Sequence, residues 1–186
     1  MKKYELVKND TKIMTGEVLY RIKALKSFGN VKKGDLGGYI ENEKNLSQDQ
    51  DAWVYDNACV YEKACVYGNA WISMNAHVSE KARISGFAHV FGNAKVSGNA
   101  HIFRHAYVSG NARVYGNARV YEYTSISEKA CVSGSAQVLG NAHVSKNANI
   151  CGYAHVSGRT HISKNANVGG HAQISGRAHI FEQVCI

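Results

Sequence analysis

The sequence predicts an all-β fold: a single-stranded parallel β-helix, wound as a triangular solenoid with 18 residues per coil, behind a small N-terminal antiparallel β cap. Two observations predict it. Every sixth position from Val54 to Ile186 is Val or Ile, without an insertion. Four residues after these positions comes Ala, replaced only by Thr124, Thr160 and Val184. A period of six is neither helical nor simple alternation, so each unit is read as a short strand followed by a corner.

The N-terminal segment lacks the six-residue repeat and instead alternates residues in the manner of ordinary strands. The stretches Tyr4–Val7 and Val18–Ile22 are predicted to be antiparallel strands, with turn candidates at Asn9-Asp10 and Thr15-Gly16. Solenoids need covered ends to stay soluble, so this segment is expected to cover the N-terminal coil. A separate binding domain is the alternative.

An imperfect first coil is expected to follow the cap, through Leu36, Ile40 and Leu46. The predicted domains are therefore the cap with this first coil, residues 1–50, and the repeat region, residues 51–186. The inward positions of the repeats are almost only Val, Ile and Ala. This composition predicts a narrow, filled column with no room for an internal ligand.

The corners of the repeats have their own signature. Gly often stands two residues after the aliphatic position and Asn three after, as at Gly68 and Asn69. Gly and Asn best tolerate left-handed backbone angles, so both positions are predicted to form the corners. Pro is absent, as expected where inner strands need an N–H donor at each position. Coils stacked about 4.8 Å apart would make a prism on the order of 35 Å long.

The repeat resembles the hexapeptide repeat of left-handed parallel β-helices over residues 54–186, and this resemblance implies the left-handed winding. The segments Val31–Ile40, Asn45–Gln48 and Trp53–Tyr55 are similar to the YdcK-like branch of these proteins, whose members are often encoded in bacterial, phage and prophage genomes. The resemblance also implies self-association, with a trimer favoured. Many hexapeptide-repeat proteins are acyl-coenzyme A-dependent transferases, so this activity is one alternative.

Composition sets further expectations. The chain has 186 residues and a formal net charge of +8. No apolar run is long enough for a membrane span and no signal peptide is visible, which predicts a cytoplasmic protein with no membrane partner. The five cysteines include no C-x-x-C pair and no two lie one coil apart in an outward column, so free thiols are expected. No cofactor is predicted.

The 18-residue spacing sorts outward residues into columns on three faces. The first face begins with an aromatic strip, which is predicted to be an oligomer interface because contiguous apolar patches usually mark contacts. Stacking between coils alone, or carbohydrate binding, are the alternatives. The C-terminal coil is expected to offer an open strand edge for end-to-end contact, with fraying as the alternative. The predicted interface residues are Trp53, Tyr55, Trp71, Phe91, Tyr107 and Ile186.

The second and third faces carry basic residues interleaved with aromatic ones, a combination used to bind nucleotides and single strands. Ordinary solubilising charge is the alternative. The predicted anion-binding residues are Arg83, Lys95, His101, Arg113, Tyr115, Arg119 and Tyr121.

The histidines do not point to catalysis or to a metal. His143, His161 and His179 fall in one column, where parallel rings are expected to point the same way instead of converging on an ion. Acyltransferase sites of related proteins depend on an excursion loop that is missing here. If the chain had a general base, His105 and His171 are the candidates, because they stand off the columns. No catalytic or metal-binding residue is therefore assigned.

Together these expectations describe a non-catalytic β-helical scaffold that self-associates and binds an anionic, nucleotide-like small molecule on its basic and aromatic faces or between subunits. A phage-encoded nucleotide sponge would have these features. A polymer-forming structural rod and an acyl-coenzyme A-dependent transferase are the two alternatives.

Overall fold

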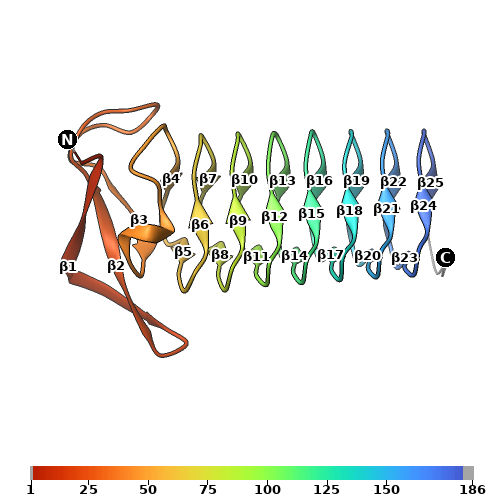
Figure 1. Ribbon diagram of the computed structural model, residues 1–186, viewed down its shortest axis with the longest axis horizontal. Helices are drawn as coiled ribbons and strands as arrows, with labels where there is room; N and C mark the ends of the chain where they lie inside the picture. Colours follow the sequence, from red (N-terminus) through yellow and green to blue (C-terminus); the bar gives the residue numbers. More distant parts are fainter. Residues whose placement is uncertain (1, 182–186) are drawn as a thin grey trace.

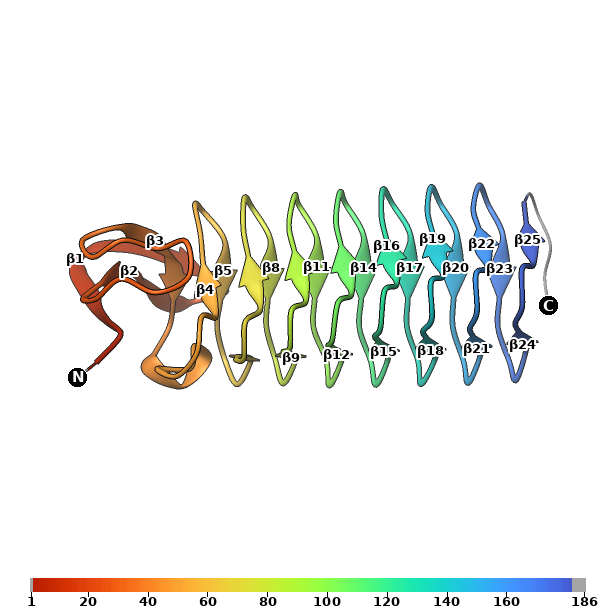
Figure 2. The same cartoon turned by 90° about the horizontal axis from the view of Figure 1, so that it is seen from above.

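The computed structural model describes residues 2–181, which form a straight rod of parallel coils with a cap of antiparallel strands at its N-terminal end (Figure 1). The coils follow one another along a single axis, and the same order is visible after a quarter turn (Figure 2). Among these residues the helical element is the short 3-10 helix η1 (Glu43–Asn45), and no helix is long and apolar enough to cross a membrane. The predicted all-β solenoid is confirmed.

Each coil contributes one two-residue strand to each of three faces. The first face consists of β4 (Trp53–Val54), β7 (Trp71–Ile72), β10 (His89–Val90), β13 (Tyr107–Val108), β16 (Ser125–Ile126), β19 (His143–Val144), β22 (His161–Ile162) and β25 (His179–Ile180). The second face consists of β5 (Cys59–Val60), β8 (His77–Val78), β11 (Lys95–Val96), β14 (Arg113–Val114), β17 (Cys131–Val132), β20 (Asn149–Ile150) and β23 (Asn167–Val168). The third face consists of β6 (Cys65–Val66), β9 (Arg83–Ile84), β12 (His101–Ile102), β15 (Arg119–Val120), β18 (Gln137–Val138), β21 (His155–Val156) and β24 (Gln173–Ile174).

The register is constant, so the predicted columns are confirmed. Each strand pairs in parallel with the strand 18 residues away, as Lys95 pairs with Arg113 and His101 with Arg119. Backbone N–H groups donate to carbonyls of the next coil at about 2.9 Å, for example from Trp71 to Ala88. The Val, Ile and Ala positions are fully buried from the first coil to Val168. Their side chains fill the axis of the rod, which leaves function to the outer faces.

The corners differ in part from the expectation. Positive φ angles occur two residues after the aliphatic position, at Gly68 and its equivalents, but not at the following Asn. The assignment of left-handed angles to Asn was therefore wrong. Asn side chains instead link successive coils, as when Asn99 Nδ2 donates to Asn117 Oδ1 at 3.0 Å and Asn147 Nδ2 donates to Asn165 Oδ1 at 3.1 Å.

Several corners place a charged residue where Gly is expected, and carboxylates there make a repeated contact. Glu122 has φ +64°, and its Oε2 accepts a hydrogen bond from the Gly140 N–H of the next coil at 2.8 Å. Glu62 and Asp56 accept in the same way from the backbone N–H groups of Glu80 and Met74. A left-handed angle costs an ordinary residue about 1–2 kcal/mol. The hydrogen bond to the next coil offsets part of that cost.

The cap consists of β1 (Tyr4–Met14), β2 (Glu17–Ala24) and β3 (Leu36–Ile40). β1 pairs with β2 and β2 with β3, both antiparallel, and β3 then pairs in parallel with β5, so one sheet runs from the cap into the second face. The turn predicted at Thr15-Gly16 is confirmed. The turn predicted at Asn9-Asp10 is wrong, because these residues lie within β1 where its register shifts.

The imperfect first coil is confirmed at two of its three positions. Ile40 and Leu46 are fully buried, and they align with Val60 and Val66 of the next coil. Leu36 is 57% exposed at the start of β3, opposite Lys23, and does not enter the core. Its assignment to the coil was therefore wrong, because Leu36 pairs with β2 of the cap, and only the end of β3, at Tyr39 and Ile40, pairs with a strand of the rod.

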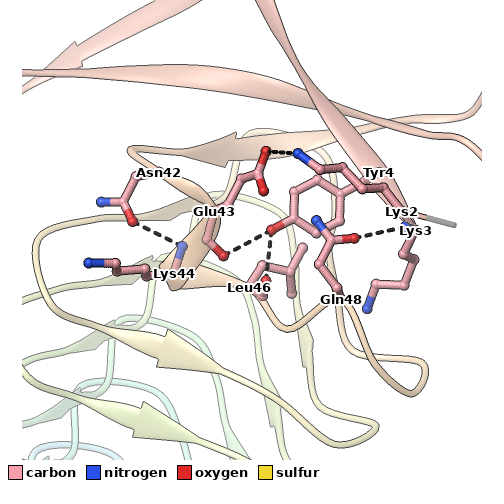
Figure 3. Close-up of polar contacts among 8 residues, drawn as sticks. All are labelled: Lys2, Lys3, Tyr4, Asn42, Glu43, Lys44, Leu46 and Gln48. Carbon is pink, nitrogen blue, oxygen red and sulfur yellow. Dashed lines mark hydrogen bonds and ion pairs between the residues drawn. The ribbon is translucent and has the colours of Figure 1, made fainter.

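The N-terminal end of the core is closed by residues with specific hydrogen bonds (Figure 3). The Lys3 side chain is fully buried, and its Nζ donates to the carbonyls of Asp49, Gln50 and Ala52 at 3.5, 3.3 and 2.9 Å. The Tyr4 hydroxyl donates to the carbonyl of Leu46 at 2.7 Å. These contacts pair carbonyl groups that no further coil covers, as buried polar groups require.

Candidate functional site

The structure divides the predicted anion-binding residues between two faces. Lys95, Arg113 and Tyr115 lie on or beside the second face, whereas Arg83, His101, Arg119 and Tyr121 lie on or beside the third. The corner at Gly116 separates Arg113 from Arg119, so the seven residues do not form one site. Each face is therefore considered separately.

The second face carries a basic hollow of about 660 Å³. Lys95 and Arg113 are direct partners in the sheet, and Arg113 pairs in turn with Cys131. No ion pair joins Lys95, Arg113 or Lys129 to a carboxylate within residues 2–181. The hollow is lined by Lys95, Ser97, Asn111, Arg113, Tyr115, Lys129 and Cys131.

Of these lining residues, Ser97, Asn111, Lys129 and Cys131 were not among the predicted site residues. Lys129 stands in the corner column one coil after Asn111, and the 18-residue spacing would have identified it. A hydrogen bond with the Cys131 side chain is the largest cause that raises the pKa of Tyr115. The tyrosine therefore keeps its proton near neutral pH and offers a hydroxyl donor to an anion.

The third face carries a column of cations around a histidine. His101 lies between Arg83 and Arg119 in the sheet, and burial, followed by these two guanidinium groups, lowers its pKa. The imidazole is therefore neutral at pH 7, and its Nε2 lies 3.4 Å from the Tyr67 hydroxyl. Tyr121 stacks on Phe103 with ring centroids 4.6 Å apart. None of these predicted residues lines the basic hollow.

The aromatic strip of the first face contains four of the six predicted interface residues: Tyr55, Trp71, Phe91 and Tyr107. Trp71 packs edge-on against Tyr55 and stacks on His89, with ring centroids 5.9 and 4.7 Å apart. Together with its neighbours the strip lines a largely apolar hollow of about 480 Å³. Tyr107 is 41% exposed.

Trp53 is a correction. It begins the same column but is 1% exposed, because Tyr4 and Phe28 of the cap pack edge-on against its ring at 6.0 and 5.3 Å. A Cβ atom on Gly37 would lie 2.8 Å from the Trp53 ring, so only glycine fits beside it. Trp53 is thus a core residue of the cap and not an interface residue. The sixth predicted interface residue, Ile186, lies outside the described residues.

The histidines stack as expected from the columns. His143, His161 and His179 form parallel rings with centroids 4.7 and 5.2 Å apart and planes within 10°. His105 lies between Phe87 and Tyr123, and His171 stacks on Tyr153, each at about 5 Å. These two candidate bases are therefore held in exposed aromatic stacks at corners of the rod.

The described cysteines, Cys59, Cys65, Cys131 and Cys151, are free thiols. Cys59 is buried below the cap, and burial is the largest cause that raises the pKa of its thiol. Cys185 lies outside the described residues.

The comparisons with known proteins agree with this geometry. A family model described as the YdcK β-solenoid repeat matches residues 106–122 and 112–128, two windows that begin six residues apart as the repeat requires. A search of curated proteins found no match. With coils of 18 residues stacked in three parallel sheets, the chain is a YdcK-like β-helix protein.

Proposed function

We propose that this β-solenoid is a non-catalytic scaffold that binds a phosphate-bearing, nucleotide-like small molecule in the basic hollow of the second face. One observation carries the proposal: Lys95 and Arg113 lie directly opposite each other, with Lys129 beside them, and no carboxylate of residues 2–181 pairs with any of the three. Like charges opposite each other in a sheet are destabilising. A bound anion would remove this repulsion.

The other lining groups suit the same ligand. The Ser97 hydroxyl, the Asn111 amide and the Tyr115 hydroxyl add neutral hydrogen-bond donors around the three cations. Arginine binds phosphate oxygens in a bidentate manner, and the exposed Tyr115 ring offers a surface on which a base stacks. The hollow is large enough for a nucleotide, since small-molecule sites span roughly 300–1,000 Å³.

Ligand-induced shifts in melting temperature test the proposal with a panel of inorganic phosphate, nucleoside triphosphates, cyclic dinucleotides and coenzyme A. At least one nucleotide is expected to stabilise the protein, and Arg113→Glu is expected to weaken its binding at least about tenfold, since the change places a carboxylate in the hollow. Arg119→Glu is the matched control, because it makes the same charge change on the third face and leaves the hollow intact. An unchanged melting temperature across the panel would contradict the proposal and favour a structural rod.

A second proposal concerns self-association. The aromatic strip of Tyr55, Trp71, Phe91 and Tyr107 exposes a largely apolar hollow on a flat sheet. Contiguous apolar surface of this kind usually marks a contact, and burying it between copies of the chain would give a homo-oligomer. The resemblance to hexapeptide-repeat proteins favours a trimer.

The mass in solution tests this second proposal, by sedimentation equilibrium across a wide range of protein concentration. The wild type is expected to be oligomeric and Tyr107→Glu to be monomeric, because the substitution buries a carboxylate in the contact. Tyr153→Glu is the control, since Tyr153 is equally aromatic and 66% exposed at a distant corner. A wild type that stays monomeric at the highest concentration would overturn the proposed interface.

No reaction is part of this proposal. The transferase alternative is tested by the coenzyme A arm of the panel and by the two candidate bases, His105 and His171. If coenzyme A alone stabilised the protein, and if acyl transfer were lost in His105→Gln or His171→Gln, the transferase would replace the scaffold as the best assignment.

A further inference from the structure

The C-terminal third of the rod includes a long stretch without carboxylates. From Lys129 to Phe181 the sequence contains no Asp or Glu, as is also true of residues 81–121. The cationic and titratable residues of this stretch are Lys129, Lys146, Arg159, Lys164, Arg177, His143, His155, His161, His171 and His179. The neighbourhood of these coils is therefore positive at neutral pH and becomes more so as the imidazoles gain protons.

Three of these histidines form a continuous ladder on the first face. His143, His161 and His179 lie in β19, β22 and β25, which follow one another at the blue end of the rod (Figure 2). All three side chains are exposed, and their rings are parallel. Partial desolvation, followed by the neighbouring His143 and His179, lowers the pKa of His161.

Apart from Glu128, the described groups around the ladder are cationic or neutral. Arg159 and Arg177 occupy the corner two residues before His161 and His179, and both are exposed. Lys146 and Lys164 occupy the opposite corner, while Ser145 and Ser163 lie beside the rings. Ser125 precedes His143 in the column, and Glu128 precedes Lys146 at its corner. Within residues 129–181 no carboxylate offsets the charge of the protonated ladder.

The arrangement of the three stacked rings indicates which kind of partner the ladder could bind. The ring faces are stacked on one another at about 5 Å, so no base can insert between them, and the side chains are exposed to solvent at their edges. Such edges donate hydrogen bonds to phosphate oxygens. The ladder spans two coil spacings, a length of roughly 10 Å. A stiff duplex would touch a flat face of this length along one line only, whereas a flexible single strand can lie along it.

We infer that the ladder of His143, His161 and His179, together with Arg159 and Arg177, binds the phosphate backbone of a single-stranded nucleic acid, without base specificity and more tightly in acid. This surface lies on a different face from the basic hollow, so it is independent of the proposed small-molecule site.

Fluorescence anisotropy of a labelled oligothymidine tests the inference with the whole protein at pH 5.5 and pH 7.5. Binding is expected to be at least about tenfold tighter at pH 5.5. The plot of log K against log salt is expected to be steeper by about 2 at pH 5.5, because three imidazoliums each contribute about 0.7 on a single strand. The triple variant His143→Gln, His161→Gln, His179→Gln is expected to lose both increments and to keep the binding of the wild type at pH 7.5.

The matched control is the triple variant His77→Gln, His101→Gln, His105→Gln, which removes as many imidazoles from outside the ladder, at the second face, the third face and a corner. It is expected to keep the pH dependence. Circular dichroism at both pH values establishes that each variant keeps the β-helix. A pH dependence that survives loss of the ladder, or that disappears equally in the control, overturns the inference. Tighter binding of a duplex of the same length than of the single strand overturns it as well.

Discussion

The two tryptophans at the start of the first face, Trp53 and Trp71, occupy equivalent positions in successive coils and have opposite surroundings. Trp53 is closed off by Tyr4 and Phe28, whereas Trp71 stacks on His89 at the surface. From the repeat alone, the two tryptophans would be expected to have the same surroundings. The first coil is stabilised by contacts with the cap, each of which is made once in the molecule. The later coils form an array in which each contact is repeated from coil to coil.

In such an array, stability is approximately a sum over coils and their interfaces, so a single outward contact contributes little. The cap has no such redundancy. Lys3 donates to three carbonyls and Tyr4 to two, and within residues 2–181 no other side chain donates a hydrogen bond to these groups. Substitutions in the cap are therefore expected to lower the free energy of unfolding more than equivalent substitutions in the coils. Four experiments test this difference.

The largest effect is expected from replacing the buried tryptophan. Trp53→Ala should lower the free energy of unfolding by about 3–5 kcal/mol, because it leaves a cavity between Tyr4 and Phe28. Trp71→Ala should cost about 1 kcal/mol, since it removes a stacking contact at a half-exposed position. Guanidinium unfolding followed by circular dichroism measures both values, and equal costs would show that the cap and the coils are not energetically distinct.

The next effect concerns the buried ammonium group. Lys3→Met should destabilise the protein by about 2–3 kcal/mol, because it leaves the carbonyls of Asp49, Gln50 and Ala52 buried without a donor. Lys2→Met, which removes a neighbouring exposed ion pair with Glu43, should cost less than about 1 kcal/mol. The same unfolding experiment compares them. If Lys3→Met were neutral, ordered water would have to replace the lysine at these carbonyls.

The same lysine predicts a pH dependence. Burial lowers the pKa of Lys3 from 10.5 to about 8, so between these values the unfolded chain binds more protons than the folded one. Stability should therefore rise with pH between pH 8 and pH 10, by on the order of 2 kcal/mol, and should be flat just below pH 8.

The raised pKa of Cys59 within this window and that of Tyr4 above pH 10 act in the opposite direction, since the unfolded thiol and hydroxyl lose their protons first. Chemical unfolding at half-unit steps from pH 7.5 to pH 10 measures the rise, and Lys3→Met should abolish it. A rise that persists in this variant would assign the effect to another group.

The smallest effects are expected at a corner of the array. Glu122→Ala should cost about 1–2 kcal/mol, because it removes the acceptor of the Gly140 N–H and keeps the left-handed angle of an ordinary residue. Glu122→Gly should be close to neutral, since relief of that angle offsets the lost hydrogen bond. Thermal unfolding measures the loss of stability in each variant. An equal loss would mean that the left-handed angle at position 122 carries no strain.

Most of the rod was predictable from the sequence, whereas the cap was only partly so. The columns followed from the register, so the neighbours of Arg113 and His161 were known before the structure. The bulge at Asn9-Asp10 was read as a turn because both residues favour turns locally. In the fold, Asp10 instead accepts hydrogen bonds from Arg21 and Tyr39, partners that lie on other strands and leave no local signal.

The candidate sites show the same division. The basic and aromatic columns, and the division of Arg113 and Arg119 between two faces, were visible as a period of 18, but the spacing did not show that the residues around Arg113 line a hollow. The predicted site also lacked Lys129, because a corner position joins a hollow only through the side chains of the adjacent strand.

By itself the sequence determined the coil, its three faces and the residues of every column, because each six-residue unit is stabilised by contacts with identical units at fixed spacing. Only the tertiary structure decided which members of a column are buried, as with Trp53 and Trp71. The segment that covers one and leaves the other exposed does not repeat, and its side chains reach the rod through contacts between residues far apart in the chain.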